Sequence, residues 1–90
     1  MPLSIEELAA AREAAAALLD EVGLEAHLFE IEPHKGEWEL AVECAIDTGW
    51  TTIKLLVEKG QLLASRDDTR VRASLLQDWR DKLAACKRQE

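Results

Sequence analysis

Residues 37–47, Glu37-Trp38-Glu39-Leu40-Ala41-Val42-Glu43-Cys44-Ala45-Ile46-Asp47, decide the fold of this chain. Every second residue from Trp38 to Ile46 is apolar, and the residues between them are acidic or alanine. This period of two is that of a β-strand with one buried and one exposed face. We therefore expect a strand over residues 37–47 that turns its tryptophan and aliphatic side chains toward a core.

Three glycines, at positions 36, 49 and 60, lie between runs with the same alternation. Two-residue loops with glycine second are typical of tight hairpins. Such loops predict four strands, at about 26–33, 37–47, 50–58 and 61–65, and they place apolar residues opposite one another: Ile31 with Leu40, Phe29 with Val42, Leu40 with Val57, Val42 with Leu55, Cys44 with Ile53, Val57 with Leu62. A slip of one residue reverses the face of a whole strand, so this agreement favours an antiparallel meander in the order 1-2-3-4.

One helix is expected before this meander in the chain and one after it. Ser4 with Glu7 forms a capping box, apolar residues then recur at helical period, and Gly23 suits the end of a helix over residues 5–22. A second helix is expected over residues 68–87, capped by Asp67 or Asp68. The apolar face of the sheet needs a cover, which predicts an α+β fold with both helices on one face.

Length and charge restrict the function. The chain has 90 residues and a net charge of −7, with 13 acidic and 4 basic residues among the first 65. This length predicts a single domain, residues 1–90, and the acidic body disfavours direct binding of nucleic acid. The sequence has no apolar run of membrane-spanning length and no signal-peptide pattern, so we expect no membrane contact and a cytoplasmic protein.

The order helix, strands, helix is similar in topology to that of double-stranded-RNA-binding domains. Those domains carry a lysine cluster at the start of their second helix, where it meets phosphates. This chain has Asp67-Asp68-Thr69-Arg70 at that place and one more expected strand. The similarity therefore implies nothing about RNA binding, and no family is assigned.

Catalytic and metal-binding chemistry finds little support. Cys44 and Cys86 show no metal-ligand spacing or disulfide framework, and we expect buried free thiols. His27 is expected opposite Cys44 on the inner face, where a catalytic pair or a metal site with Cys86 is much less favoured than plain core packing. A row of Glu32, Glu39 and Glu58 has the chemistry to attract a cation, but a solvated acidic surface is the better interpretation. We expect no cofactor, no metal and no catalytic residue.

The outer face of the sheet is the expected functional surface. Its pattern predicts an apolar strip of Leu28, Ala41, Leu56 and Leu63 edged by carboxylates, and the residues expected to make contacts are Leu28, Glu30, Glu32, Glu39, Ala41, Glu43, Trp50, Leu56, Glu58 and Leu63. A contiguous apolar patch with a polar rim is typical of protein–protein contacts. Scattered leucines on a solvated sheet are the equally weighted alternative.

Two functional hypotheses follow. The first is a small non-enzymatic protein-interaction module that binds a partner protein, or its own copy as a homodimer, through the open face or the edge of the fourth strand. The second is an acidic inhibitor that presents carboxylate rows to the basic groove of a nucleic-acid-binding protein. A small thiol-dependent enzyme that uses Cys44 and His27 is a third and weaker hypothesis.

Overall fold

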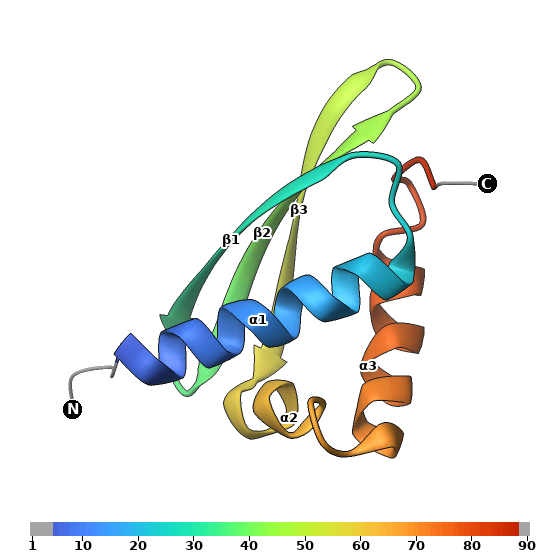
Figure 1. Ribbon diagram of the computed structural model, residues 1–90. Helices are drawn as coiled ribbons and strands as arrows, with labels where there is room; N and C mark the ends of the chain where they lie inside the picture. The colour runs from blue at the N-terminus through green and yellow to red at the C-terminus, as the bar shows by residue number, and fades with distance from the viewer. Residues whose placement is uncertain (1–4, 89–90) are drawn as a thin grey trace.

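The computed structural model describes residues 5–88 (Figure 1), so the expected cap at Ser4 lies outside the described residues. Its elements follow in the order α1 (Ile5–Val22), β1 (His27–His34), β2 (Glu37–Ile46), β3 (Gly49–Glu58), α2 (Lys59–Ala64) and α3 (Thr69–Lys82). The three strands form one antiparallel sheet in the order β1-β2-β3. The expected α+β class with an antiparallel sheet is therefore confirmed.

Helix α1 occupies the residues expected from its apolar period. Its buried side chains recur every three or four positions along one stripe: Ala11, Ala14, Ala15, Leu18, Leu19 and Val22. Gly23 ends the helix with φ +78°, and its N–H donates to the carbonyl oxygen of Leu19 at 3.2 Å. A residue with a side chain adopts this left-handed conformation only at a cost, which explains the glycine.

The first hairpin has the expected register. Ile31 pairs with Leu40 and Phe29 pairs with Val42. The turn consists of Lys35 and Gly36, with φ of +50° and +83°, as a two-residue type I′ loop requires.

The second hairpin differs from the expectation by two residues. The strands β2 and β3 meet with Ile46 opposite Gly49, so the loop is Asp47-Thr48 and Leu40 pairs with Leu55 instead of Val57. The expected pairs Val42–Leu55 and Cys44–Ile53 are wrong for the same reason, because Val42 faces Ile53. Aspartate and threonine suit a turn through their short polar side chains. A shift of two leaves every side chain on its expected face, which is why alternation alone did not reveal it.

The expected fourth strand is wrong, because residues 59–64 form helix α2. One helical turn brings Leu62 and Ser65 to the same side, where both are buried. The Ser65 hydroxyl donates to the carbonyl oxygen of Leu62 at 2.6 Å, and the backbone oxygen of Ser65 accepts from the Arg72 Nε at 3.0 Å. Glycine at position 60 signals a hairpin in the sequence, but here the burial of Leu62 outweighs that preference.

Helix α3 begins as expected and ends five residues early. Asp68 is its N-cap and accepts from the backbone N–H of Arg70 at 2.9 Å. The helix ends at Lys82, and the chain after it returns to the sheet, where the Lys87 N–H donates to the Ala45 oxygen and the Glu25 N–H to the Lys87 oxygen, both at 2.8 Å. The expected end of this helix at residue 87 is therefore wrong.

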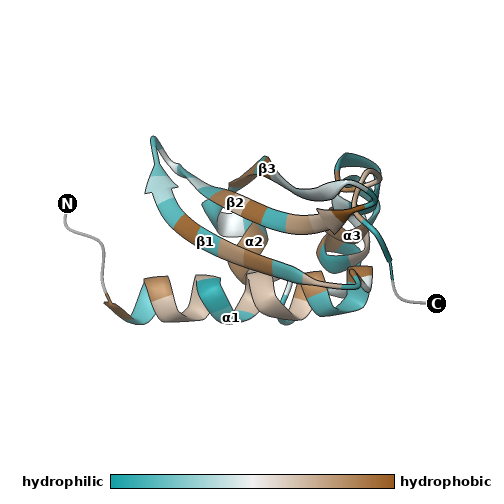
Figure 2. Ribbon diagram, turned by 90° about the horizontal axis from the view of Figure 1, so that it is seen from above, coloured by the Kyte–Doolittle hydropathy of each residue, from teal (hydrophilic) through white to brown (hydrophobic). Residues whose placement is uncertain are grey.

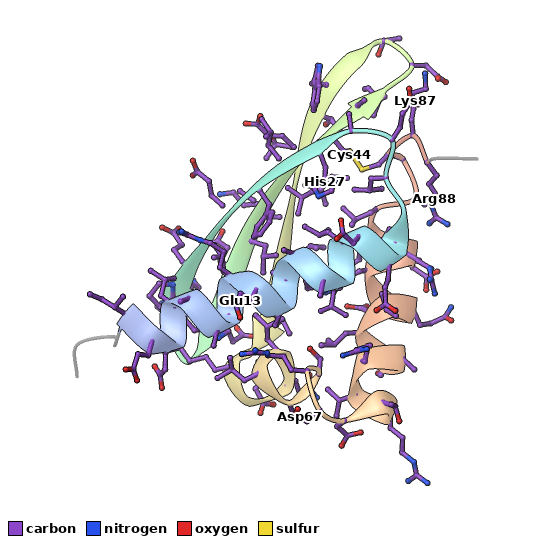
Figure 3. The ribbon with its side chains drawn as sticks, in the orientation of Figure 1. Glu13, His27, Cys44, Asp67, Lys87 and Arg88 are labelled. Carbon is purple, nitrogen blue, oxygen red and sulfur yellow. A yellow bond between two sulfur atoms is a disulfide. The ribbon has the colours of Figure 1, made fainter. Side chains whose placement is uncertain are left out.

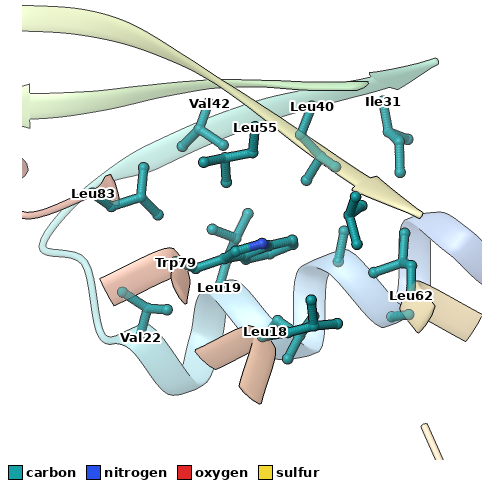
Figure 4. Close-up of a cluster of buried hydrophobic side chains, with 14 of the residues drawn as sticks. Leu18, Leu19, Val22, Ile31, Leu40, Val42, Leu55, Leu62, Trp79 and Leu83 are labelled. Atoms are coloured by element: carbon teal, nitrogen blue, oxygen red, sulfur yellow. The ribbon is translucent and has the colours of Figure 1, made fainter. Parts of the chain in front are cut away.

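The core consists of buried side chains from both the sheet and the helices (Figure 4). Its fully buried large side chains come from the sheet and from all three helices of the described residues. They include Trp38, Leu40 and Leu55 of the strands, Leu18 and Leu19 of α1, Leu62 of α2 and Trp79 of α3. Figure 2 shows the alternating hydropathy along the strands that separates this buried face from an exposed one.

Candidate protein-interaction face

The exposed face of the sheet, which we call the open face, consists of even-numbered residues of β1 and β3 and odd-numbered residues of β2. The register arranges it in rows across the three strands, and these rows are His34–Glu37–Glu58, Glu32–Glu39–Leu56, Glu30–Ala41–Lys54 and Leu28–Glu43–Thr52, with Trp50 beside Ala45 at the end. Each of these side chains is exposed or half-buried. Nine of the ten residues expected from sequence lie on this face.

The tenth residue, Leu63, does not belong to the open face. It lies on α2, half-buried against the core. The expected apolar strip is therefore wrong, and the shifted register separates its other members as well, because Ala41 faces Lys54 and Leu56 faces Glu39. The large apolar side chains instead stand apart, with exposed fractions of 65% for Leu28, 58% for Trp50 and 48% for Leu56.

The expected row of three carboxylates is also wrong. Glu58 faces Glu37, while Glu32 and Glu39 share their row with Leu56. Across the whole face the sheet carries six glutamates and one lysine, with the glutamates at positions 30, 32, 37, 39, 43 and 58. Within residues 5–88, no three His, Cys, Asp or Glu side chains gather closely enough to hold a metal ion.

Lys54 partly balances these charges. Its Nζ lies 3.6 Å from one carboxylate oxygen of Glu39, and the His34 Nδ1 lies 3.9 Å from the other. Glu39 takes part in both contacts, and 18% of its side chain is accessible. The sequence reasoning left Lys54 and Glu37 out of the expected site, although their alternation places both on the outer face.

Two shallow hollows mark the middle of the open face. One, of about 160 Å³, reaches from Glu32 to Lys54, and the other, of about 300 Å³, reaches from Leu28 to Glu43. Both are lined by Glu30 and Ala41, because the alanine methyl leaves space between longer neighbours. A third and wider hollow, of about 470 Å³, lies where α1 leads into β1 and includes Leu28 and Trp50 in its lining.

The two cysteines form a disulfide, Cys44–Cys86, and the expectation of free thiols is wrong (Figure 3). His27 lies opposite Cys44 as expected. A disulfide-bonded sulfur is neither a nucleophile nor a thiolate ligand, so the bonded pair offers neither of the two roles considered for Cys44 and His27. Sequence spacing could not reveal the bond, because it joins residues 42 positions apart in the chain.

The disulfide also bears on the expected compartment. Disulfides persist in oxidising compartments and are rare in the cytosol. The cytoplasmic location therefore stays a prediction from the sequence, with this observation against it. None of the helices within residues 5–88 is long and apolar enough to cross a membrane.

Comparison of the chain with protein-family models, with curated proteins and with solved structures finds no match in any of the three. The function must therefore be argued from the geometry.

Proposed function

We propose that this chain is a non-enzymatic protein-interaction module that binds a partner protein through its open face. The observation that carries the proposal is the exposure of Leu28, Trp50 and Leu56 on one face of the sheet among carboxylates. Exposed apolar side chains with a polar surround are typical of protein contacts, whereas each of them alone is ordinary.

The proposal includes the placement of both long helices under the opposite face. Leu19 of α1, together with Trp79 and the following Leu83, belongs to the buried cluster of Val42 and Leu55, which point inward from the sheet (Figure 4). With α1 and α3 on that side, a partner has access to the whole outer surface of β1, β2 and β3.

The charge of the open face indicates which kind of partner surface it fits. Six glutamates and one lysine give the open face a strong negative potential, which accelerates association with a basic surface and opposes an acidic one. Two copies of this chain stacked face to face would oppose glutamates to glutamates. The open face therefore fits a partner whose lysines or arginines surround a small apolar centre that covers Ala41 and Leu56.

The test is capture from a lysate of the host by immobilised protein, with three variants compared at physiological salt. The charge-reversed variant Glu30→Lys/Glu32→Lys/Glu43→Lys and the apolar variant Leu28→Ser/Leu56→Ser are both expected to lose the captured partner. The control, Glu6→Lys/Glu21→Lys/Asp81→Lys, changes net charge equally at exposed helical positions and is expected to keep it. A partner that binds all three variants alike would show that the open face is not the binding surface.

A second candidate function is inhibition of a nucleic-acid-binding protein, and the excess of glutamates on the open face favours it. Carboxylates on one face compete with phosphates for lysines and arginines. The captured partner, loaded with fluorescent DNA or RNA, is expected to release it as the present protein is added. If the partner binds this protein and the nucleic acid at the same time, the fluorescence anisotropy of the nucleic acid stays high. That result would contradict inhibition but not the proposed interaction module.

A further inference from the structure

Strand β3 is an edge of the sheet whose outer hydrogen-bonding groups have no partner. The pair Ile46–Gly49 closes a two-residue loop, so the N–H and C=O groups of odd-numbered β3 residues point to β2 and those of Trp50, Thr52, Lys54 and Leu56 point outward. The N–H of Ala45 donates to Ala26, which independently shows that odd-numbered residues of β2 face β1. Within residues 5–88, no backbone hydrogen bond outside the regular elements involves residues 50–57.

The opposite edge of the sheet is protected. Pro33 removes a donor from the outward row of β1, α1 runs along this strand (Figure 2), and the returning residues 87 and 88 pair with Glu25 and Leu24 at its beginning. Proline and covering segments are the devices that prevent edge-to-edge pairing. Strand β3 has neither between residues 50 and 56, and its one charged side chain there, Lys54, already contacts Glu39.

The sequence of β3 is complementary to itself in one antiparallel register. Outward-pointing residues must oppose each other, and the two-fold axes nearest the middle of residues 50–56 that achieve this lie at residues 52, 53 and 54. An axis at residue 54 places Lys54 against Lys54, and an axis at residue 52 leaves Leu56 beside the turn. Only the axis at Ile53 opposes Trp50 to Leu56 and Thr52 to Lys54, each twice by symmetry.

We propose that β3 pairs with β3 of a second copy about a two-fold axis at Ile53, which forms a continuous six-stranded sheet. Trp50 and Leu56, both about half exposed in one chain, then cover each other across the seam. No like charges stand opposite each other in this register, whereas stacked open faces would oppose six glutamates to six. The pairing uses the edge of β3 and is argued without the proposed partner. It covers Trp50 and Leu56 and leaves Leu28 and the glutamates of the open face free for that partner.

The decisive experiment compares two variants of opposite charge at position 52. Their dimerisation is measured by sedimentation equilibrium. In the proposed register residue 52 faces Lys54 of the other copy, so Thr52→Glu is expected to tighten the dimer and Thr52→Lys to weaken it, each by roughly 2- to 30-fold in Kd for two cross-strand pairs. An axis at residue 52 would oppose position 52 to itself, so both variants would weaken the dimer. That result, or equal affinities for the two variants, would overturn the register.

A backbone variant tests the edge itself. Thr52→Pro removes an outward N–H that makes no bond within the chain, so the fold is expected to survive while the dimer is lost. Thr52→Val keeps the N–H and is the matched control, with circular dichroism to confirm both folds. A wild-type protein that stays monomeric at about 100 µM, well above the micromolar Kd of a typical modest complex, would overturn the proposal. A folded Thr52→Pro variant that dimerises as tightly as the wild type would also overturn it.

Discussion

Cys44, in the central strand of the sheet, is bonded to Cys86, which lies beyond the end of α3 and 42 residues later in the chain. Both residues are buried, with exposed fractions of 0% and 4%. The bond holds the segment after α3 against the sheet, where Lys87 completes the backbone hydrogen bonds of Ala45 and Glu25. One covalent link therefore joins the middle and last thirds of the chain within the buried core.

Reduction of this disulfide is expected to lower the free energy of unfolding by about 4 kcal/mol, because an open chain of this loop length regains conformational entropy when it unfolds. Urea unfolding with and without dithiothreitol measures the difference. The variant Cys44→Ala/Cys86→Ala provides the control, since reductant is expected to leave its midpoint unchanged. Equal midpoints for the oxidised and reduced wild-type protein would show that the bond contributes nothing to stability.

Gly60→Ala distinguishes helix α2 from the hairpin expected from sequence. In a helix, alanine is favoured over glycine by about 1 kcal/mol, so the variant is expected to be more stable. The new methyl group meets only the flexible end of Glu58, at 3.3 Å. The matched variant Gly36→Ala, at a true hairpin glycine with φ +83°, is expected to lose about 1 kcal/mol. Thermal unfolding of both decides the matter, because a loss of stability in Gly60→Ala would argue for a turn at residue 60.

Lys35→Asn is expected to stabilise the first hairpin. Lys35 has φ +50°, a left-handed conformation that costs a lysine about 1–2 kcal/mol and an asparagine less. Asn-Gly is also the preferred pair for a type I′ loop. The free energy of unfolding, measured with urea, is therefore expected to rise by part of this cost of about 1–2 kcal/mol. Lys59→Asn, at the start of α2, serves as the control and should bring no such gain, since the residue lies in a helix.

Asp68→Ala tests the start of α3. The Asp68 carboxylate accepts from the backbone N–H groups of Arg70, at 2.9 Å, and Val71, at 3.3 Å. Loss of an N-cap costs about 1 kcal/mol on average. Asp67→Ala removes the neighbouring carboxylate, which is not the cap, and is expected to change the free energy of unfolding little. Similar losses in the two variants would mean that general charge near the helix, rather than the cap, matters.

The open face was predictable because it depends on a local pattern. Alternation from Trp38 to Ile46 identifies the two faces of a strand without knowledge of its neighbours, and the loop at Lys35 and Gly36 sets the first register. The second register was not predictable to better than two residues, since Gly49 fits both the end of a turn and the start of a strand. That difference moved Leu56 from Ala41 to Glu39 and placed Lys54 opposite Ala41, while both side chains stayed on the open face.

The sequence by itself determined which residues of the central chain face inward, where α1 begins and ends, and that the exposed sheet surface is acidic. These properties follow from periodicity, caps and charge within short stretches. Tertiary structure alone decided that residues 59–64 coil into α2, that α3 ends at Lys82 and that Cys44 meets Cys86. Each of these results depends on which distant surface is available for burial, as Leu62 and Cys86 show, and no local pattern carries that information.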